Sequence, residues 1–190
     1  MSFSANADAR SFDGTSSTIL TQALWIAGFA ATTALAARLE IPHYPVPFTL
    51  QTMVVLLAGA FLGSRNAAMS QVLYMASGVL GLPVFAGGSW GVWILIGPTG
   101  GYLLAFPLAA ALVGYLLRER RSLAAITLSM AAGLLAIFTV GTIHLYAVMV
   151  HDIGNAVTAG FLIFSWWDVL KLGAASMIYF EIAKRWPKVG

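Results

Sequence analysis

The fold of this chain is decided by an uncharged stretch, residues 18–37, with the sequence TILTQALWIAGFAATTALAA. A helix needs about 20 mostly apolar residues to cross the hydrocarbon core of a bilayer, and this stretch supplies them without a charged side chain or a proline. It therefore predicts a membrane-spanning helix from Thr18 to Ala37. The same criterion of length and apolar composition can be applied to the rest of the chain.

The overall composition also indicates an integral membrane protein. Of the 190 residues, 59% are hydrophobic and 9% are charged, and the mean hydropathy is +0.85. A soluble domain carries about 25% charged residues, and a disordered chain is far less hydrophobic. The net charge of +3 does not predict nucleic-acid binding, because so few charges cannot form a basic face. With no cysteine in the sequence, disulfides, Cys-ligated metals and thiol catalysis are excluded.

Five further spans follow from the apolar stretches and from the residues that break them. Prolines at 42, 45 and 47 end any helix there, and the Gly- and Trp-rich segment 84–97 is interpreted as a re-entrant or surface loop. We therefore expect an all-α integral membrane protein with six transmembrane helices in one domain, residues 18–183. Residues 1–17 are expected to form a flexible cytoplasmic tail and residues 184–190 a cytoplasmic C-terminus. The spans after the first are Phe48–Gly63, Ala67–Leu82, Pro98–Leu117, Ser122–Val150 and Gly154–Ile182.

The distribution of Lys and Arg between the spans predicts the orientation. Cytoplasmic segments of membrane proteins carry an excess of these residues. With the N-terminus inside, the outer segments hold only Arg38, so both termini are predicted to be cytoplasmic. The inner segments hold Arg10, Arg65, Arg118, Arg120, Arg121, Lys184, Arg185 and Lys188.

Asp168 and Lys171 lie deep inside the last predicted span. Their spacing places them on one helix face, and an unpaired charge there costs about 2.5–3.5 kcal/mol on insertion scales. Counting about 1.5 Å per residue from Gly154 places Asp168 about 20 Å along the span, near mid-membrane. We interpret the pair as a solute site, in which Lys171 attracts a carboxylate and Asp168 accepts N–H donors. A neutralising ion pair that only fixes packing, and proton coupling through Asp168, are the alternatives.

Two glycine-rich segments, residues 81–90 and 97–102, allow backbone to approach a ligand closely. Apolar walls would come from Phe85, Trp90, Trp93 and Tyr102, although an interfacial loop with an aromatic belt gives the same composition. The sequence contains no P-loop, Gly-x-Ser-x-Gly or His-Glu-x-x-His motif, so neither ATP binding nor catalysis is predicted. The three scattered histidines do not predict a metal site.

Alanines recur at intervals of four in the first predicted span. Small residues at this spacing let two helices pack closely, and the partner is either another span of this chain or another subunit. The two series are Ala23, Ala27, Ala31 and Ala30, Ala34.

Three motifs closely resemble the BioY family. They are VPFTLQTMVVLLAGAFLG at 46–63, GLPVFAGG at 81–88 and GPTGGYLLAF at 97–106. Asp168 and Lys171 also look like the family's Asp-x-x-Lys pair. The resemblance runs, with the motifs in order, from about the first span to the end of the chain.

The resemblance implies a biotin-binding substrate-capture (S) component of an energy-coupling factor (ECF) transporter, and not an enzyme. It implies six helices around one biotin near the outer face of a bacterial or archaeal plasma (inner) membrane, with the Pro-rich segment 42–47 as a lid. The partners it implies are a transmembrane coupling (T) protein and two cytoplasmic ATPases; no cofactor is implied, and a homo-oligomer stays open. Expected biotin-binding residues are Asp168, Lys171, Gln51, Phe48, Phe85, Gly88, Trp90 and Tyr102, and expected partner-interface residues are Ala27, Ala30, Ala31 and Ala34.

The chemistry of biotin fits these residues. Asp168 can accept from the ureido N–H groups, and Lys171 can meet either the ureido oxygen or the carboxylate. The alternatives are capture of another vitamin-like carboxylate and a solitary biotin transporter, oligomeric or proton-coupled. A membrane enzyme acting on lipid and a purely structural subunit are the remaining alternatives.

Overall fold

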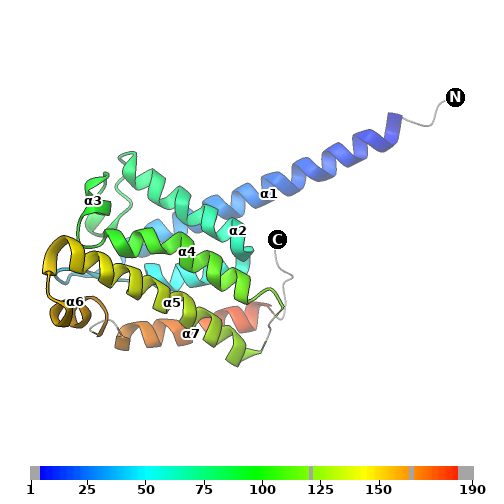
Figure 1. Ribbon diagram of the computed structural model, residues 1–190. Coiled ribbons are helices and arrows are strands. Elements are labelled where there is room, and N and C mark those ends of the chain that lie inside the picture. The colour runs from blue at the N-terminus through cyan, green and yellow to red at the C-terminus, as the bar shows by residue number, and fades with distance from the viewer. Residues whose placement is uncertain (1–4, 120–121, 163–164, 184–190) are drawn as a thin grey trace.

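The computed structural model describes residues 5–119, 122–162 and 165–183, and it shows a helical bundle (Figure 1). Two very short strands form an antiparallel pair, the one departure from the expected all-α content in the described residues. Helices α3 and α6 lie at one end of the bundle, opposite the start of α1 and the end of α7. The elements are α1 (Ala5–Arg38), β1 (Glu40–Ile41), β2 (Phe48–Thr49), α2 (Gln51–Val79), η1 (Ala86–Gly88), α3 (Trp93–Ile96), α4 (Gly100–Leu116), α5 (Leu123–Leu145), the π-helix η2 (Tyr146–Val150), α6 (Ile153–Gly160) and α7 (Ser165–Ala183).

Helix α1 is longer than the sequence predicted. It begins at Ala5 rather than Thr18, so the expected flexible tail is helical from residue 5 onward. Figure 1 shows this first part projecting away from the other helices. The helix ends at Arg38, a basic residue in the last turn, where a positive charge is favourable beside the unpaired carbonyls.

Helix α2 is a helical hairpin. Gly63 lies inside it with φ 73° and ψ 174°, a left-handed value of φ that glycine adopts without steric cost. The amide nitrogen Nε2 of Gln51, at the start of α2, donates to the Tyr74 hydroxyl at 2.6 Å, so the second arm returns alongside the first. The two predicted spans Phe48–Gly63 and Ala67–Leu82 are therefore the two arms of α2, and the chain reverses at the predicted break.

Close approach between helices fixes the turn of this hairpin. A side chain at Gly114 of α4 would overlap the backbone of Gly63 and Ser64, so α4 packs directly against the turn. Because only glycine leaves room for this backbone contact, α4 and both arms of α2 form the centre of the bundle. Val55, Ala58 and Ala109 are among the fully buried residues here.

A small polar cluster joins α1 to the second arm of α2. Gln71 Nε2 donates to Thr33 Oγ1 at 3.3 Å and to Ser70 Oγ at 3.2 Å. The Thr33 hydroxyl donates to the Phe29 carbonyl at 2.8 Å, and the Ser70 hydroxyl donates to the Ala67 carbonyl at 2.7 Å. All three polar side chains are 0% exposed. We call Thr33, Ser70 and Gln71 the packing cluster.

The last predicted span is wrong as a single helix. Helix α6 ends at Gly160 and α7 begins at Ser165, so the stretch Gly154–Ile182 contains two helices. Asp168 therefore lies in the first turn of α7, and the depth obtained by counting along one helix from Gly154 is incorrect. An acidic residue in a first turn is instead placed where the helix dipole stabilises it.

The described helices are those of a membrane protein. Three segments are long and apolar enough to cross a bilayer: Thr18–Arg38, Gln51–Val79 and Leu123–Val150; α4 is a shorter apolar helix. The outward faces carry large apolar side chains, for example Leu35, Leu108 and Leu128, each more than 60% exposed. Such surfaces are stable when lipid covers them. The chain is an all-α, multi-pass membrane protein.

Candidate ligand-binding site

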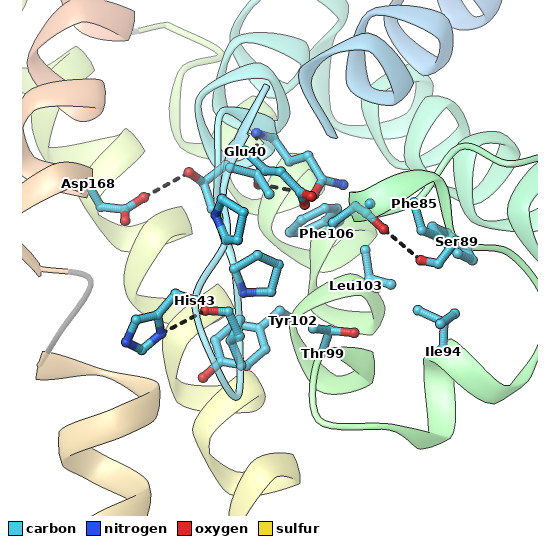
Figure 2. Close-up of a pocket in the computed structure, with 18 of the residues that line it drawn as sticks. Glu40, His43, Phe85, Ser89, Ile94, Thr99, Tyr102, Leu103, Phe106 and Asp168 are labelled. Carbon is cyan, nitrogen blue, oxygen red and sulfur yellow. Dashed lines mark hydrogen bonds between the residues drawn. The ribbon is translucent and has the colours of Figure 1, made fainter. Parts of the chain in front are cut away.

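A cavity of about 350 Å³ opens at the end of the bundle that carries β1 and β2 (Figure 2). This volume falls within the range of about 300–1,000 Å³ that is common for small-molecule sites. Asp168 approaches the cavity from one side, and Phe85, Ser89 and Ile94 lie on the other. The lining residues are Glu40, Pro42, His43, Val46, Pro47, Thr49, Gln51, Thr52, Phe85, Ala86, Gly87, Ser89, Ile94, Thr99, Tyr102, Leu103, Phe106, Phe138, Asp168 and Lys171.

The Pro-rich loop between the strands covers the cavity. β1 pairs with β2 through Glu40 opposite Thr49 and Ile41 opposite Phe48, and this pairing closes residues 42–47 into a loop. Val46 is buried, and the His43 ring hydrogen-bonds to its carbonyl through Nδ1 at 3.3 Å. We call residues 40–49 the lid; they include the Pro-rich segment 42–47, for which the role of a lid stays a prediction.

Asp168 and Lys171 form a buried ion pair at the cavity wall. The Lys171 Nζ to Asp168 Oδ1 distance is 2.7 Å, and the two residues are 9% and 1% exposed. Lys171 Nζ also donates to the Thr49 carbonyl and to Thr52 Oγ1, both at 2.8 Å. An ammonium group has three N–H donors, so this geometry occupies all of them with protein acceptors. We call Thr49, Thr52, Asp168 and Lys171 the cavity cluster.

One oxygen of Asp168 has no partner among the described residues. Oδ1 accepts from Lys171 and from the Thr52 hydroxyl, the latter at 2.8 Å, whereas Oδ2 is buried and unpaired. A buried acceptor left without a donor costs about 1–3 kcal/mol, and more when it is charged. An N–H or O–H donor placed beside Asp168 Oδ2 would remove this cost.

Gln51 connects the cavity cluster to the far wall. Its Oε1 accepts from the Thr49 hydroxyl at 3.0 Å, and its Nε2 donates to Tyr74. The Tyr74 hydroxyl in turn donates to the Val84 carbonyl at 3.3 Å. The amide is thus held in one orientation, with protein partners at both of its polar atoms.

Aromatic rings supply the apolar walls. Phe85 is 1% exposed and packs edge-on against Tyr74, with ring centroids 5.6 Å apart. Tyr102 packs edge-on against Phe138 at 6.3 Å and donates to the Gly160 carbonyl at 2.7 Å. Edge-to-face pairs of this kind hold rings in a fixed orientation. The cavity therefore combines rigid apolar walls with few polar atoms, the usual design of a small-molecule site.

Comparison with known proteins adds the family to this geometry. The sequence matches the model of the BioY family over residues 7–188. The chain belongs to the BioY family. A relative from Thermotoga maritima, named biotin transporter BioY, is 39% identical over 156 residues, covering 82% of this chain and 92% of the relative. Another from Pyrococcus horikoshii, named probable biotin transporter BioY, is 37% identical over 153 residues, covering 80% of this chain and 90% of the relative.

A solved structure has the same fold. The S-component for biotin from an ECF-type ABC transporter matches with a TM-score of 0.81 at 23% identity, covering 97% of this chain and 96% of the other. The match extends over nearly the whole of both chains, so the two proteins share their overall fold.

The structure brings together five of the eight residues that the sequence predicted for the BioY site. Asp168, Lys171, Gln51, Phe85 and Tyr102 line the cavity. The other three predicted residues, Phe48, Gly88 and Trp90, do not line it. Trp90 is 61% exposed; Gly88 is flanked by two lining residues, Gly87 and Ser89; and the ring of Phe48 packs instead against His43 at 5.1 Å.

Several lining residues of this BioY chain were missed by the sequence interpretation. Thr52 follows Gln51 inside the motif VPFTLQT, and its hydroxyl at the start of an apolar stretch was the available signal. Glu40 and His43 lie in the Pro-rich segment, where charged side chains beside a lid were equally visible. Leu103, Phe106 and Phe138 gave no separate signal, because apolar helix residues look alike whether they face lipid or a cavity.

The two alanine series of α1 lie on different faces of the helix. Ala27 and Ala31 are exposed, as is Ala23, and they form an outward stripe. Ala30 is 7% exposed and Ala34 packs against the core, so these two face the bundle. Within this chain Ala30 and Ala34 therefore pack toward the bundle, whereas Ala27 and Ala31 are exposed.

Proposed function

We propose that this chain is a membrane-embedded biotin-binding protein that captures biotin for uptake, and that it acts as a transport protein rather than an enzyme. The observation that carries the proposal is the unpaired, buried Oδ2 of Asp168 at the wall of an apolar cavity. The names of its relatives, biotin transporter BioY, support the same function.

We propose roles for the residues whose part in biotin binding the sequence left open, and the geometry supports them. A ureido N–H of biotin donates to Asp168 Oδ2, while Lys171 Nζ has its three N–H donors directed to protein acceptors and is not available to a ligand anion. The fused rings and valeryl chain lie against Phe85, Tyr102 and neighbouring apolar residues. The carboxylate of biotin then lies away from Asp168, because like charges at close range repel.

Isothermal titration of the purified chain with biotin tests this function. We expect saturable binding, and a loss of about 10–100-fold in affinity for Asp168→Asn, because the charged acceptor is removed. The matched control is Asp152→Asn, whose side chain caps α6 outside the cavity. Absence of saturable binding by the unmodified chain would contradict the proposal.

Capture of another vitamin-like carboxylate is the alternative. Competition with lipoate, thiamine and riboflavin distinguishes it. Lipoate carries a carboxylate and an apolar chain but no N–H group, so it leaves Asp168 Oδ2 unpaired and should not displace biotin. Displacement of biotin by lipoate at equal concentration would favour the alternative.

We also propose six membrane crossings with both termini in the cytoplasm. Two crossings come from the arms of α2, one each from α1, α4 and α5, and one from α6 and α7 together. The Lys and Arg distribution supports the orientation. The chain contains no cysteine, so single replacements report cleanly: Ser122→Cys should react with an impermeant thiol reagent only in inside-out vesicles, and Tyr44→Cys only in right-side-out ones. The opposite pattern would overturn the orientation.

The partners are proposed as a transmembrane coupling protein and two ATPases. The exposed stripe of Ala27 and Ala31 supports a close helix contact with another subunit. Ala27→Leu with Ala31→Leu should abolish co-purification with co-expressed partners and leave biotin binding intact. Ala174→Leu, on the exposed face of α7, is the control. Biotin uptake into proteoliposomes by the chain alone would support a solitary transporter instead.

A further inference from the structure

Thr52 occupies the centre of the cavity cluster. It is the second residue of α2, it lines the cavity, and its side chain lies between two residues of α7. Its Oγ1 is 2.8 Å from Asp168 Oδ1 and 2.8 Å from Lys171 Nζ. One hydroxyl therefore joins both charges of the ion pair to a different helix.

The direction of each hydrogen bond at Thr52 is fixed by chemistry. An ammonium group has only donors, so Thr52 Oγ1 must accept from Lys171. The single hydroxyl hydrogen is then directed to Asp168 Oδ1, because a carboxylate has only acceptors. Oδ1 receives two charge-assisted bonds, from Thr52 and from Lys171, and Oδ2 receives none.

Without this hydroxyl the carboxylate would be held by Lys171 alone. The terminal torsion of an Asp side chain is broad, and the flexible lysine stem lets Nζ move toward either oxygen. Oδ2 would then be shared with the ammonium group and would no longer be kept free of protein donors. The bond from Thr52, on a separate helix, prevents this rotation.

We propose that Thr52 is a positioning residue that keeps Asp168 Oδ2 free and aimed at the ligand. This inference rests on the proposed function, because it assigns to Thr52 the selectivity for a ligand N–H group. Thr52 itself need not touch the ligand; it acts through the orientation of Asp168.

Two substitutions separate the hydroxyl from the shape of the side chain. Thr52→Val keeps the size and removes the hydroxyl, and Thr52→Ser keeps the hydroxyl. By titration calorimetry we expect Thr52→Val to weaken biotin binding by about 10–100-fold, the range for a hydrogen bond to a charged group, and Thr52→Ser to stay within about threefold. The control is Thr127→Val on the outer face of α5, where the hydroxyl bonds only to the Leu123 carbonyl.

A second ligand gives a readout that loss of stability alone would not change. The unmodified chain should prefer biotin to a biotin methylated on both ureido nitrogens by at least about tenfold, because methylation leaves Oδ2 unpaired. In Thr52→Val this preference should shrink, whereas damage to the fold lowers both affinities equally. In an Asp168→Asn background, Thr52→Val should add little, as expected for two residues that act as a unit.

The outcomes are distinguishable. If the unmodified chain does not bind biotin, the proposed function and this inference fail together. If it binds biotin and Thr52→Val retains both the affinity and the preference over the methylated ligand, only the role of Thr52 is overturned. A poorly folded Thr52→Val is replaced by Thr52→Ala, for which the same change in preference is expected.

Discussion

Two buried polar clusters in this protein have opposite character. The packing cluster of Thr33, Ser70 and Gln71 is completely enclosed, and its hydrogen bonds end on protein groups. The cavity cluster is charged, lies at the wall of a cavity and leaves Asp168 Oδ2 without a partner. A cluster whose polar atoms all have hydrogen-bond partners specifies how two helices pack. A cluster beside a cavity that leaves one acceptor without a donor can bind a ligand through that acceptor. Burial of polar groups alone therefore does not identify a site.

Among substitutions in the two clusters, Lys171→Met is expected to have the largest effect on stability and on biotin binding. It leaves the buried carboxylate without its cation, which costs about 3–5 kcal/mol of unfolding free energy. Biotin binding should also be lost. Thermal unfolding in detergent measures the first effect and calorimetry the second.

The double variant Asp168→Asn with Lys171→Met serves as the control. Because it has no unpaired charge, it should recover most of the lost stability without recovering biotin affinity. Equal instability of the single and double variants would show that the ion pair is not what Lys171 contributes.

Gln71→Leu should affect stability but not binding. Removal of the amide leaves the neighbouring hydroxyls without one partner, at a cost of about 1–3 kcal/mol. Because Gln71 is 0% exposed and does not line the cavity, biotin affinity should be unchanged. A loss of affinity that exceeds the loss of stability would mean that the packing cluster also takes part in capture.

Tyr74→Phe is expected to be intermediate. The Tyr74 hydroxyl accepts from Gln51 and donates to Val84, so it connects the cavity wall to the second arm of α2. Its loss should cost about 1 kcal/mol of stability and weaken biotin binding modestly through a less ordered Gln51. Hydrogen exchange at residues 84–89 would report the loosened wall, and unchanged exchange would argue against this link.

Trp90→Ala serves as the reference substitution outside both clusters, and it is expected to have the smallest effect. The ring is 61% exposed and lies outside the cavity lining, and exposed substitutions usually change stability by less than about 0.5 kcal/mol. Both the unfolding midpoint and the biotin affinity should therefore match those of the unmodified chain. A large loss of biotin affinity would show that Trp90 takes part in biotin binding.

The features that could be predicted from the sequence are those that depend on composition and on helix-breaking residues. The apolar stretch from Thr18, the reversal at Gly63, and the pairing of Asp168 with Lys171 were all predictable, because charge, glycine and proline are visible signals. The break between α6 and α7 was not predictable. No proline lies between Gly154 and Ile182, so the stretch lacks the breaker that marks other helix ends.

The predicted site residues that do not line the cavity have a similar explanation. Trp90 follows Gly87 and Gly88 and precedes Gly91, all with positive φ. Such glycines permit many chain directions, so the orientation of the neighbouring ring cannot be derived from spacing. The unpaired state of Asp168 Oδ2 was also hidden, because it depends on a hydroxyl 116 residues away in the chain.

The prolines of the lid have a consequence for the entropy of capture. Pro42, Pro45 and Pro47 lie between the paired strands and restrict the backbone of the loop through their rings. A loop that has few accessible conformations when open loses little conformational entropy when it closes over a ligand. More of the contact free energy at Asp168 and at the aromatic walls then appears as affinity. A lid of the same length built from glycine and serine would close over the same contacts and hold the ligand less tightly.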